Sequence, residues 1–171
     1  LRIAMPLPEL LTSRLHLRNW QPADLLRFAQ LNSDPQVMQH FPGCLPREQS
    51  DALAARIQQH IEHHGFGPWV LELREQPGLI GILGLQHVLF DSAFTPAVEI
   101  GWRLLPAYWQ QGLATEAAQA ALRFAFEQLS PTDFNHTLIA IDEFHHVSVD
   151  GDNRLGALLD TVMKVSSAHI V

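Results

Sequence analysis

The stretch from about residue 97 to residue 129 constrains the fold more than any other part of the chain, because it predicts a strand, a tight loop and a helix in direct succession. Residues 97–105 are typical of a strand, and residues 106–112 hold one proline and one glycine. From Ala114 to Leu129 apolar residues recur at the spacing of one helix face. A strand followed at once by a helix indicates a sheet that is covered by helices.

The other predicted elements surround this unit. Residues Arg14–Arg18 alternate polar and apolar side chains, as a half-buried strand does. Gln21–Asp24 opens a short helix, and Pro46–His64 forms a longer one. Residues 69–90 predict a β-hairpin whose second arm carries two glycines, a sign of a bulge or a close neighbour, and residues 137–141 predict a further strand. We therefore expect a mixed α/β fold with a mixed central sheet flanked by helices.

The loop before the last predicted helix is suited to bind an anion. The first N–H groups of a helix have no partner inside the helix, and the helix dipole places partial positive charge there. Gly112 allows close approach of the backbone, and Ala114 leaves room above the first turn. No acidic side chain occurs from Pro106 to Thr115, and Glu116 can point away from the loop. A single glycine before a helix is, by itself, also typical of a plain loop.

The residues of this unit resemble a known family. The strings Val98–Trp102 and Tyr108–Ala117 resemble the acyl-CoA motif of the GCN5-related N-acetyltransferases (GNAT), most closely the branch that acetylates ribosomal-protein N-termini. The strings Leu11–Arg18 and Leu79–Gly84 are similar to the first strand and the hairpin of that branch. The likeness covers about residues 10–141 and implies the acyl-CoA N-acyltransferase fold.

The resemblance also implies how acetyl-CoA binds. The pantetheine arm is expected along the strand at Trp102, Arg103 and Leu104. The pyrophosphate is expected on the backbone of the loop and first helical turn, at Gln110, Gln111, Gly112, Leu113, Ala114 and Thr115. The family often has glycine where this chain has Gln110, whereas Trp109 is familiar in the ribosomal-protein branch.

Transfer of an acetyl group to an amine requires a neutral amine, stabilisation of the thioester oxygen and a proton for the departing thiolate. We expect Glu99 to be the catalytic base. On a strand its side chain shares a face with Gly101 and Arg103, so the alternatives for Glu99 are an ion pair with Arg103 or a place on a solvated face of the sheet. Direct attack needs no covalent intermediate, and we interpret Cys44 as a structural thiol.

The tail leaves the function open to alternatives. We expect one N-acetyltransferase domain over residues 1–171 that moves an acetyl group to a protein N-terminus or a small amine. From about residue 142, however, the sequence diverges from the family pattern, with a helix predicted near 154–163 and a strand near 168–171. The alternative is a non-catalytic acyl-CoA-binding or protein-interaction module. A weaker third interpretation is a phosphate-binding domain for another nucleotide.

Composition narrows the partners and the location. Lys and Arg total 11 against 18 Asp and Glu, and the net charge of −7 disfavours nucleic acid and favours a cationic acceptor. The single cysteine excludes an internal disulfide and fits a cytoplasmic location. No apolar run has the length of a membrane span, so we expect no membrane partner. The sequence does not fix the oligomeric state, and a homodimer is one possibility.

Ten histidines raise the question of a metal. His60, His63 and His64 share one helix at a spacing that can hold an ion. His145 and His146 could add ligands, but the sequence fixes no acidic ligand beside the helix, and histidines at a helix C-terminus also suit the helix dipole. We therefore expect no metal. The aromatic residues that could line an acceptor pocket are Trp20, Phe41 and Trp69, although a place in the core is the default for such residues.

Overall fold

A computed structural model describes residues 6–89, 91, 98–128, 137–142 and 145–150. The described strands form one sheet in chain order, and all neighbours run antiparallel except β5 and β6, which are parallel. The strands are β1 (Leu10–Leu11), β2 (Leu15–Arg18), β3 (Pro68–Leu73), β4 (Gln76–His87), β5 (Val98–Leu104), β6 (Thr137–Asp142) and β7 (His145–Asp150).

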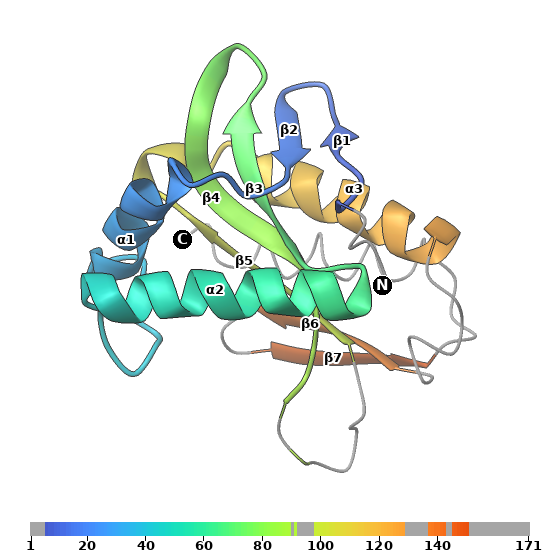
Figure 1. Cartoon of the computed structure of the whole chain (residues 1–171). Helices are drawn as coiled ribbons and strands as arrows, with labels where there is room; N and C mark the ends of the chain where they lie inside the picture. The colour runs from blue at the N-terminus through green and yellow to red at the C-terminus, as the bar shows by residue number, and fades with distance from the viewer. Residues whose placement is uncertain (1–5, 90, 92–97, 129–136, 143–144, 151–171) are drawn as a thin grey trace.

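Helices cover both faces of this sheet. Helices α1 (Asp24–Ser33) and α2 (Arg47–His64) lie on one face, and α3 (Leu113–Gln128) lies on the other (Figure 1). A parallel pair of strands requires a crossover, and α3 is the crossover between β5 and β6. The 3-10 helix η1 (Pro106–Tyr108) leads from β5 toward α3. The predicted mixed sheet flanked by helices is therefore confirmed.

A buried ion network fixes α1 to the sheet. Arg18 on β2 is 5% exposed and donates from both terminal nitrogens to the Asp24 carboxylate at 2.8 Å. Its Nε donates to Glu72 on β3 at 2.7 Å. The hydrogen bond to Asp24 outweighs burial and raises the pKa of Arg18. The network satisfies a buried charge, which would otherwise be costly, and joins two strands to the start of a helix.

Two glycines allow the central strands to approach each other closely. A Cβ atom at Gly84 would lie 2.4 Å from the Gly67 oxygen and 2.4 Å from the Pro68 Cα. A Cβ atom at Gly81 would lie 2.2 Å from the Arg103 backbone oxygen. The close neighbour predicted for the second hairpin arm is confirmed at both positions.

The two ends of the described sheet are not expected from the sequence. Neither β1 nor β7 is predicted from the sequence, and β7 extends the sheet antiparallel to β6. The predicted helix near 154–163 and strand near 168–171 lie outside the described residues. Within the part that is described, no helix is both long and apolar enough to cross a membrane.

The close approach at Gly84 makes a testable prediction. We expect Gly84→Ala to lower the free energy of unfolding by about 2–3 kcal/mol, because the added methyl group meets backbone rather than a movable side chain. Gly101→Ala is the matched control, since a Cβ atom there has nothing within 4 Å. Urea denaturation of both variants measures the difference, and equal midpoints would contradict the prediction.

Candidate active site

Strand β5 separates from β6 part of the way along its length. On its other side β5 pairs with β4 throughout, from Val98 opposite His87 to Leu104 opposite Gly81. The ladder with β6 contains three residue pairs and stops at Ile100. Over residues 101–104 the described part of the chain places no strand beside this edge. An open strand edge can accept another extended group through backbone hydrogen bonds.

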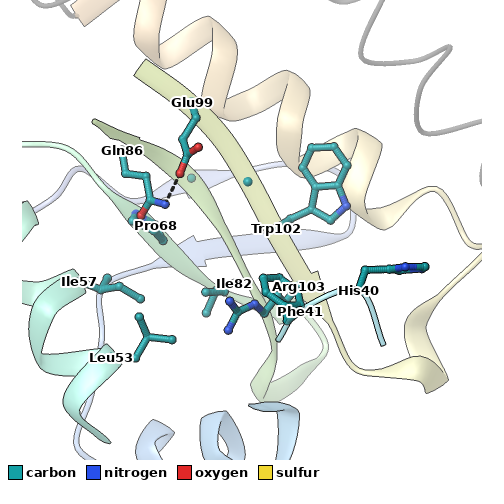
Figure 2. A pocket seen from close by; sticks show the side chains of 12 residues that line it. His40, Phe41, Leu53, Ile57, Pro68, Ile82, Gln86, Glu99, Trp102 and Arg103 are labelled. Carbon is teal, nitrogen blue, oxygen red and sulfur yellow. Dashed lines mark hydrogen bonds between the residues drawn. The ribbon is translucent and has the colours of Figure 1, made fainter. Parts of the chain in front are cut away.

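A pocket of about 330 Å³ lies against the same part of β5. Glu99, Gly101 and Arg103 line it, as the two-residue period of a strand predicts, and Trp102 also borders it (Figure 2). The rest of the lining comes from the loop before α2 and from α2, β3 and β4: His40, Phe41, Leu53, Ile57, Pro68, Ile82, Gly84 and Gln86. The pocket therefore combines a largely apolar wall with one carboxylate and one guanidinium group.

The carboxylate of Glu99 is half-buried and oriented by its neighbour on β4. Gln86 lies directly opposite Glu99 in the sheet, and its Nε2 donates to Glu99 Oε1 at 2.5 Å (Figure 2). The space beside it is open, because Gly101 has no side chain and nothing lies near its Cβ position. Glu99 thus presents a positioned hydrogen-bond acceptor to the pocket.

Arg103 makes contacts that join the pocket to α1. Its Nη1 donates to Asn32 Oδ1 at 2.7 Å, and its guanidinium carbon lies 4.1 Å from the centre of the Phe41 ring. Asn32 is fully buried and donates to Ser50 on α2 at 2.9 Å. The sequence also offers Glu99 as an ion-pair partner of Arg103. The structure instead shows Glu99 hydrogen-bonded to Gln86 and Arg103 hydrogen-bonded to Asn32, so that alternative gains no support.

The remaining predicted cofactor residues lie outside the pocket lining: Leu104 is the last residue of β5, and residues 110–115 follow beyond its C-terminal end. Gln110, Gln111 and Gly112 are exposed, whereas Leu104 and Leu113 are buried and Ala114 and Thr115 are half-buried. Gln110 has a φ of 58° and Gly112 a φ of 73°. The left-handed backbone at Gln110 gives a physical reason for the glycine that related sequences often have there. The predicted residues therefore form two groups, a pocket group and a loop group.

Glu116 holds the loop group in place, a role that sequence reasoning missed. Its carboxylate turns toward the β1–β2 connection and accepts hydrogen bonds from Thr12 Oγ1 at 2.6 Å, from Ser13 Oγ at 3.0 Å and from the Arg14 backbone and Nε at 2.9 and 2.7 Å. Arg14 Nη1 in turn donates to the Gln111 carbonyl at 2.8 Å. Burial alone would raise the pKa of Glu116, but the hydrogen bonds from Thr12, Arg14 and Ser13 outweigh it and lower the pKa to about 2.

Of the three aromatic residues considered for the acceptor pocket, only Phe41 is among the residues that line it. Trp69 is fully buried, packs edge-on against Phe124 and belongs to the core, which is the default role expected for these aromatic residues. Trp20 is half-buried against Phe28 and does not line the pocket. Cys44 is exposed in the loop before α2 and does not line it either.

The fold and the site place the chain among the acetyltransferases. Residues 14–157 match the acetyltransferase (GNAT) domain family. The chain belongs to this family, as the resemblance of its central motif predicts.

Two curated relatives come from Bacillus subtilis. YnaD, an uncharacterized N-acetyltransferase, is 32% identical over 120 residues, which is 70% of this chain and 66% of YnaD. YeeB, to which an ATP-dependent helicase function is ascribed, is 56% identical over 52 residues, or 30% of this chain. The chain covers 9% of the length of YeeB, so most of that protein has no counterpart here.

Solved structures share the fold. An acetyltransferase from Agrobacterium tumefaciens matches with a TM-score of 0.69 and 25% identity, covering 95% of this chain and 85% of that one. The spermidine N-acetyltransferase from Vibrio cholerae, solved with CoA and spermine, has a TM-score of 0.55 and 22% identity over 75% and 71% of the two chains. The ribosomal-protein-S5-alanine acetyltransferase from Vibrio fischeri has a TM-score of 0.58 and 13% identity over 91% and 81%.

The hydrogen bonds of Glu116 predict a pH-dependent contribution to stability. Its pKa falls from 4.5 in the unfolded chain to about 2 in the folded protein, so the stabilisation is complete above about pH 4.5 and is lost as the pH falls from there toward 2. We expect Glu116→Gln to lower the free energy of unfolding by about 1–2 kcal/mol at neutral pH, allowing for solvent exposure of Arg14.

Urea denaturation of both proteins between about pH 3 and pH 7 measures this contribution. The difference between wild type and Glu116→Gln should shrink as the pH falls through the window. Glu127→Gln, at an exposed site on the same helix, is the control. The difference in unfolding free energy between this variant and the wild type should stay the same across the pH range. A difference for Glu116→Gln that stayed constant across this range would contradict the assignment.

Proposed function

We propose that this chain is an N-acetyltransferase that moves the acetyl group of acetyl-CoA to a primary amine by direct attack. The observation that carries the proposal is the open edge of β5 beside a pocket that contains the Glu99 carboxylate. The open edge offers a place for the thioester, and the carboxylate offers an acceptor for the proton of the amine. Family membership supports the same chemistry.

The loop group fits the phosphates of the cofactor. Its backbone at residues 110–112 is exposed, next to the N-terminus of α3, where N–H groups that have no partner within the helix and the helix dipole favour an anion. The Glu116 carboxylate is turned away and paired with Arg14, so it does not oppose a phosphate. In this proposal the pantetheine arm runs along Trp102, Arg103 and Leu104.

The transfer step requires a neutral amine. The amine nitrogen attacks the thioester carbon, the N–C bond forms and the C–S bond breaks, and the departing thiolate takes a proton from solvent. Glu99 accepts the proton that the amine loses, directly or through a water molecule. Its hydrogen bond to Gln86 holds the carboxylate in place while leaving the second oxygen available. Backbone N–H groups near Ile100 and Gly101 are proposed to polarise the thioester oxygen.

The pocket suggests the type of acceptor. Phe41, Leu53, Ile57 and Ile82 form an apolar wall next to Glu99, which suits an amine attached to an apolar body. Solved relatives include enzymes named for spermidine and for a ribosomal-protein alanine, and we propose either a protein N-terminus or a small amine for this chain. A cytoplasmic location and a homodimer stay predictions.

An assay of CoA release tests the function. The purified chain is mixed with acetyl-CoA and a panel of polyamines and short peptides, and the released thiol is followed with a chromogenic disulfide reagent. Because Cys44 is exposed and would react as well, the assay uses a Cys44→Ser background. Release of CoA that depends on one class of amine is the expected result. Calorimetric binding of acetyl-CoA without release by any amine would instead support the non-catalytic module.

The role of Glu99 predicts a specific kinetic change. We expect Glu99→Gln to lower kcat at least about a hundredfold with the KM for acetyl-CoA within about twofold, because the amide keeps the shape of the side chain but cannot accept the proton. Glu127→Gln, remote on α3, should retain full turnover. If Glu99→Gln also retained full turnover, Glu99 would be removed from the mechanism.

A further inference from the structure

Three histidine side chains meet at the end of α2, on a different part of the molecule from the loop group. His60 and His64 lie one turn apart on α2, and His87 is the last residue of β4. The centres of the His64 and His87 rings are 4.5 Å apart, as are those of His60 and His64. One nitrogen from each ring lies within 4.8 Å of the other two. We call this group the histidine triad.

The tautomer of His60 follows from its hydrogen bonds. Its Nδ1 lies 3.0 Å from the Phe66 carbonyl oxygen, which can only accept, so Nδ1 carries the proton. Its Nε2 accepts from the His87 backbone N–H at 3.2 Å, so Nε2 holds the lone pair of the ring, and an ion bound there takes the place of this hydrogen bond. A second nitrogen that donates to a backbone carbonyl is the arrangement that orients metal-binding histidines.

Burial favours the neutral form of two imidazoles of the histidine triad, those of His60 and His64. Burial and then the neighbouring His64 lower the pKa of His60 to about 4. Burial and then His87 lower the pKa of His64. Neutral imidazole is the form that binds a metal, whereas imidazolium does not.

We propose that the histidine triad is a binding site for a divalent transition-metal cation of the zinc type. Three imidazole ligands with a fourth position for water form a common zinc environment. Tetrahedral coordination brings the nitrogens to about 3.3 Å from one another, so the rings must close further than in the metal-free arrangement. His64 is exposed on the last turn of α2, and rotation of its side chain brings its nitrogen inward.

This site revises the expectation that the chain binds no metal. That expectation considered His60, His63 and His64 on one helix, with no acidic ligand fixed beside them. The structure adds His87 from a strand and leaves His63 outside the set. Because α2 and β4 each contribute residues to the pocket, an ion held by the histidine triad would clamp two of the pocket's walls together. His87 also directly follows Gln86, the partner of Glu99.

A metal titration tests the site. The purified chain, freed of any affinity tag, is titrated with Zn²⁺ and with Co²⁺. We expect one ion per chain with a dissociation constant below about 1 μM, a tetrahedral Co²⁺ absorption spectrum, and a Tm that rises by about 5–10 °C at a hundredfold excess over the dissociation constant. Mg²⁺ should have no effect, because it prefers oxygen ligands.

Variants locate the site. His64→Ala and His87→Ala should each weaken Zn²⁺ binding at least about tenfold, and His64 is exposed, so its variant retains the fold. His63→Ala is the matched control on the same helix and should bind as the wild type does. A dissociation constant for Zn²⁺ above about 1 μM, or equal weakening of Zn²⁺ binding by His63→Ala, would overturn the proposal. Neither result bears on the acetyl transfer, which the CoA assay measures separately.

Discussion

The arrangement of the site depends on the point at which β5 leaves β6. Three residue pairs join these strands, and among the described residues the rest of β5 continues with a partner strand on one side only. Because the pair is parallel, the chain must cross over between the strands, and the crossover places the start of α3 at the end of β5. An open strand edge, a helix N-terminus and the pocket are therefore brought together by one change in strand pairing.

Two ionic networks hold the elements around this point. Arg18 joins β2, β3 and the start of α1. Its guanidinium group is buried and paired with the carboxylates of Asp24 and Glu72. Glu116 joins α3 to the β1–β2 connection, and through Arg14 it reaches the carbonyl of Gln111. The first network fixes a helix next to the pocket, and the second fixes the loop at the end of β5. Gln110 keeps a left-handed backbone within that loop although it is not glycine.

Local patterns predicted most of the fold. The strand, loop and helix from Val98 to Gln128 appear where the periodicity indicates them, and Gly84 lies at the close approach that a glycine inside a strand suggests. Contacts between distant residues carry no such signal, so the bonds from Thr12 to Glu116 and the meeting of His60 with His87 could not be predicted. Trp69 shows the same limit, because an aromatic residue in a strand fits a pocket wall and a core equally well.

The position of the single cysteine has a practical consequence. Cys44 is exposed, and it lies a few residues after Phe41, which lines the pocket, and just before α2 begins. Its neighbour Leu45 is anchored, because its backbone N–H donates to the Asn32 carbonyl at 2.8 Å. A fluorophore or spin label attached to this sulfur would therefore stand on a fixed base, three residues along the chain from a side chain that lines the pocket. Its signal would report directly on molecules that enter, without any engineered attachment site.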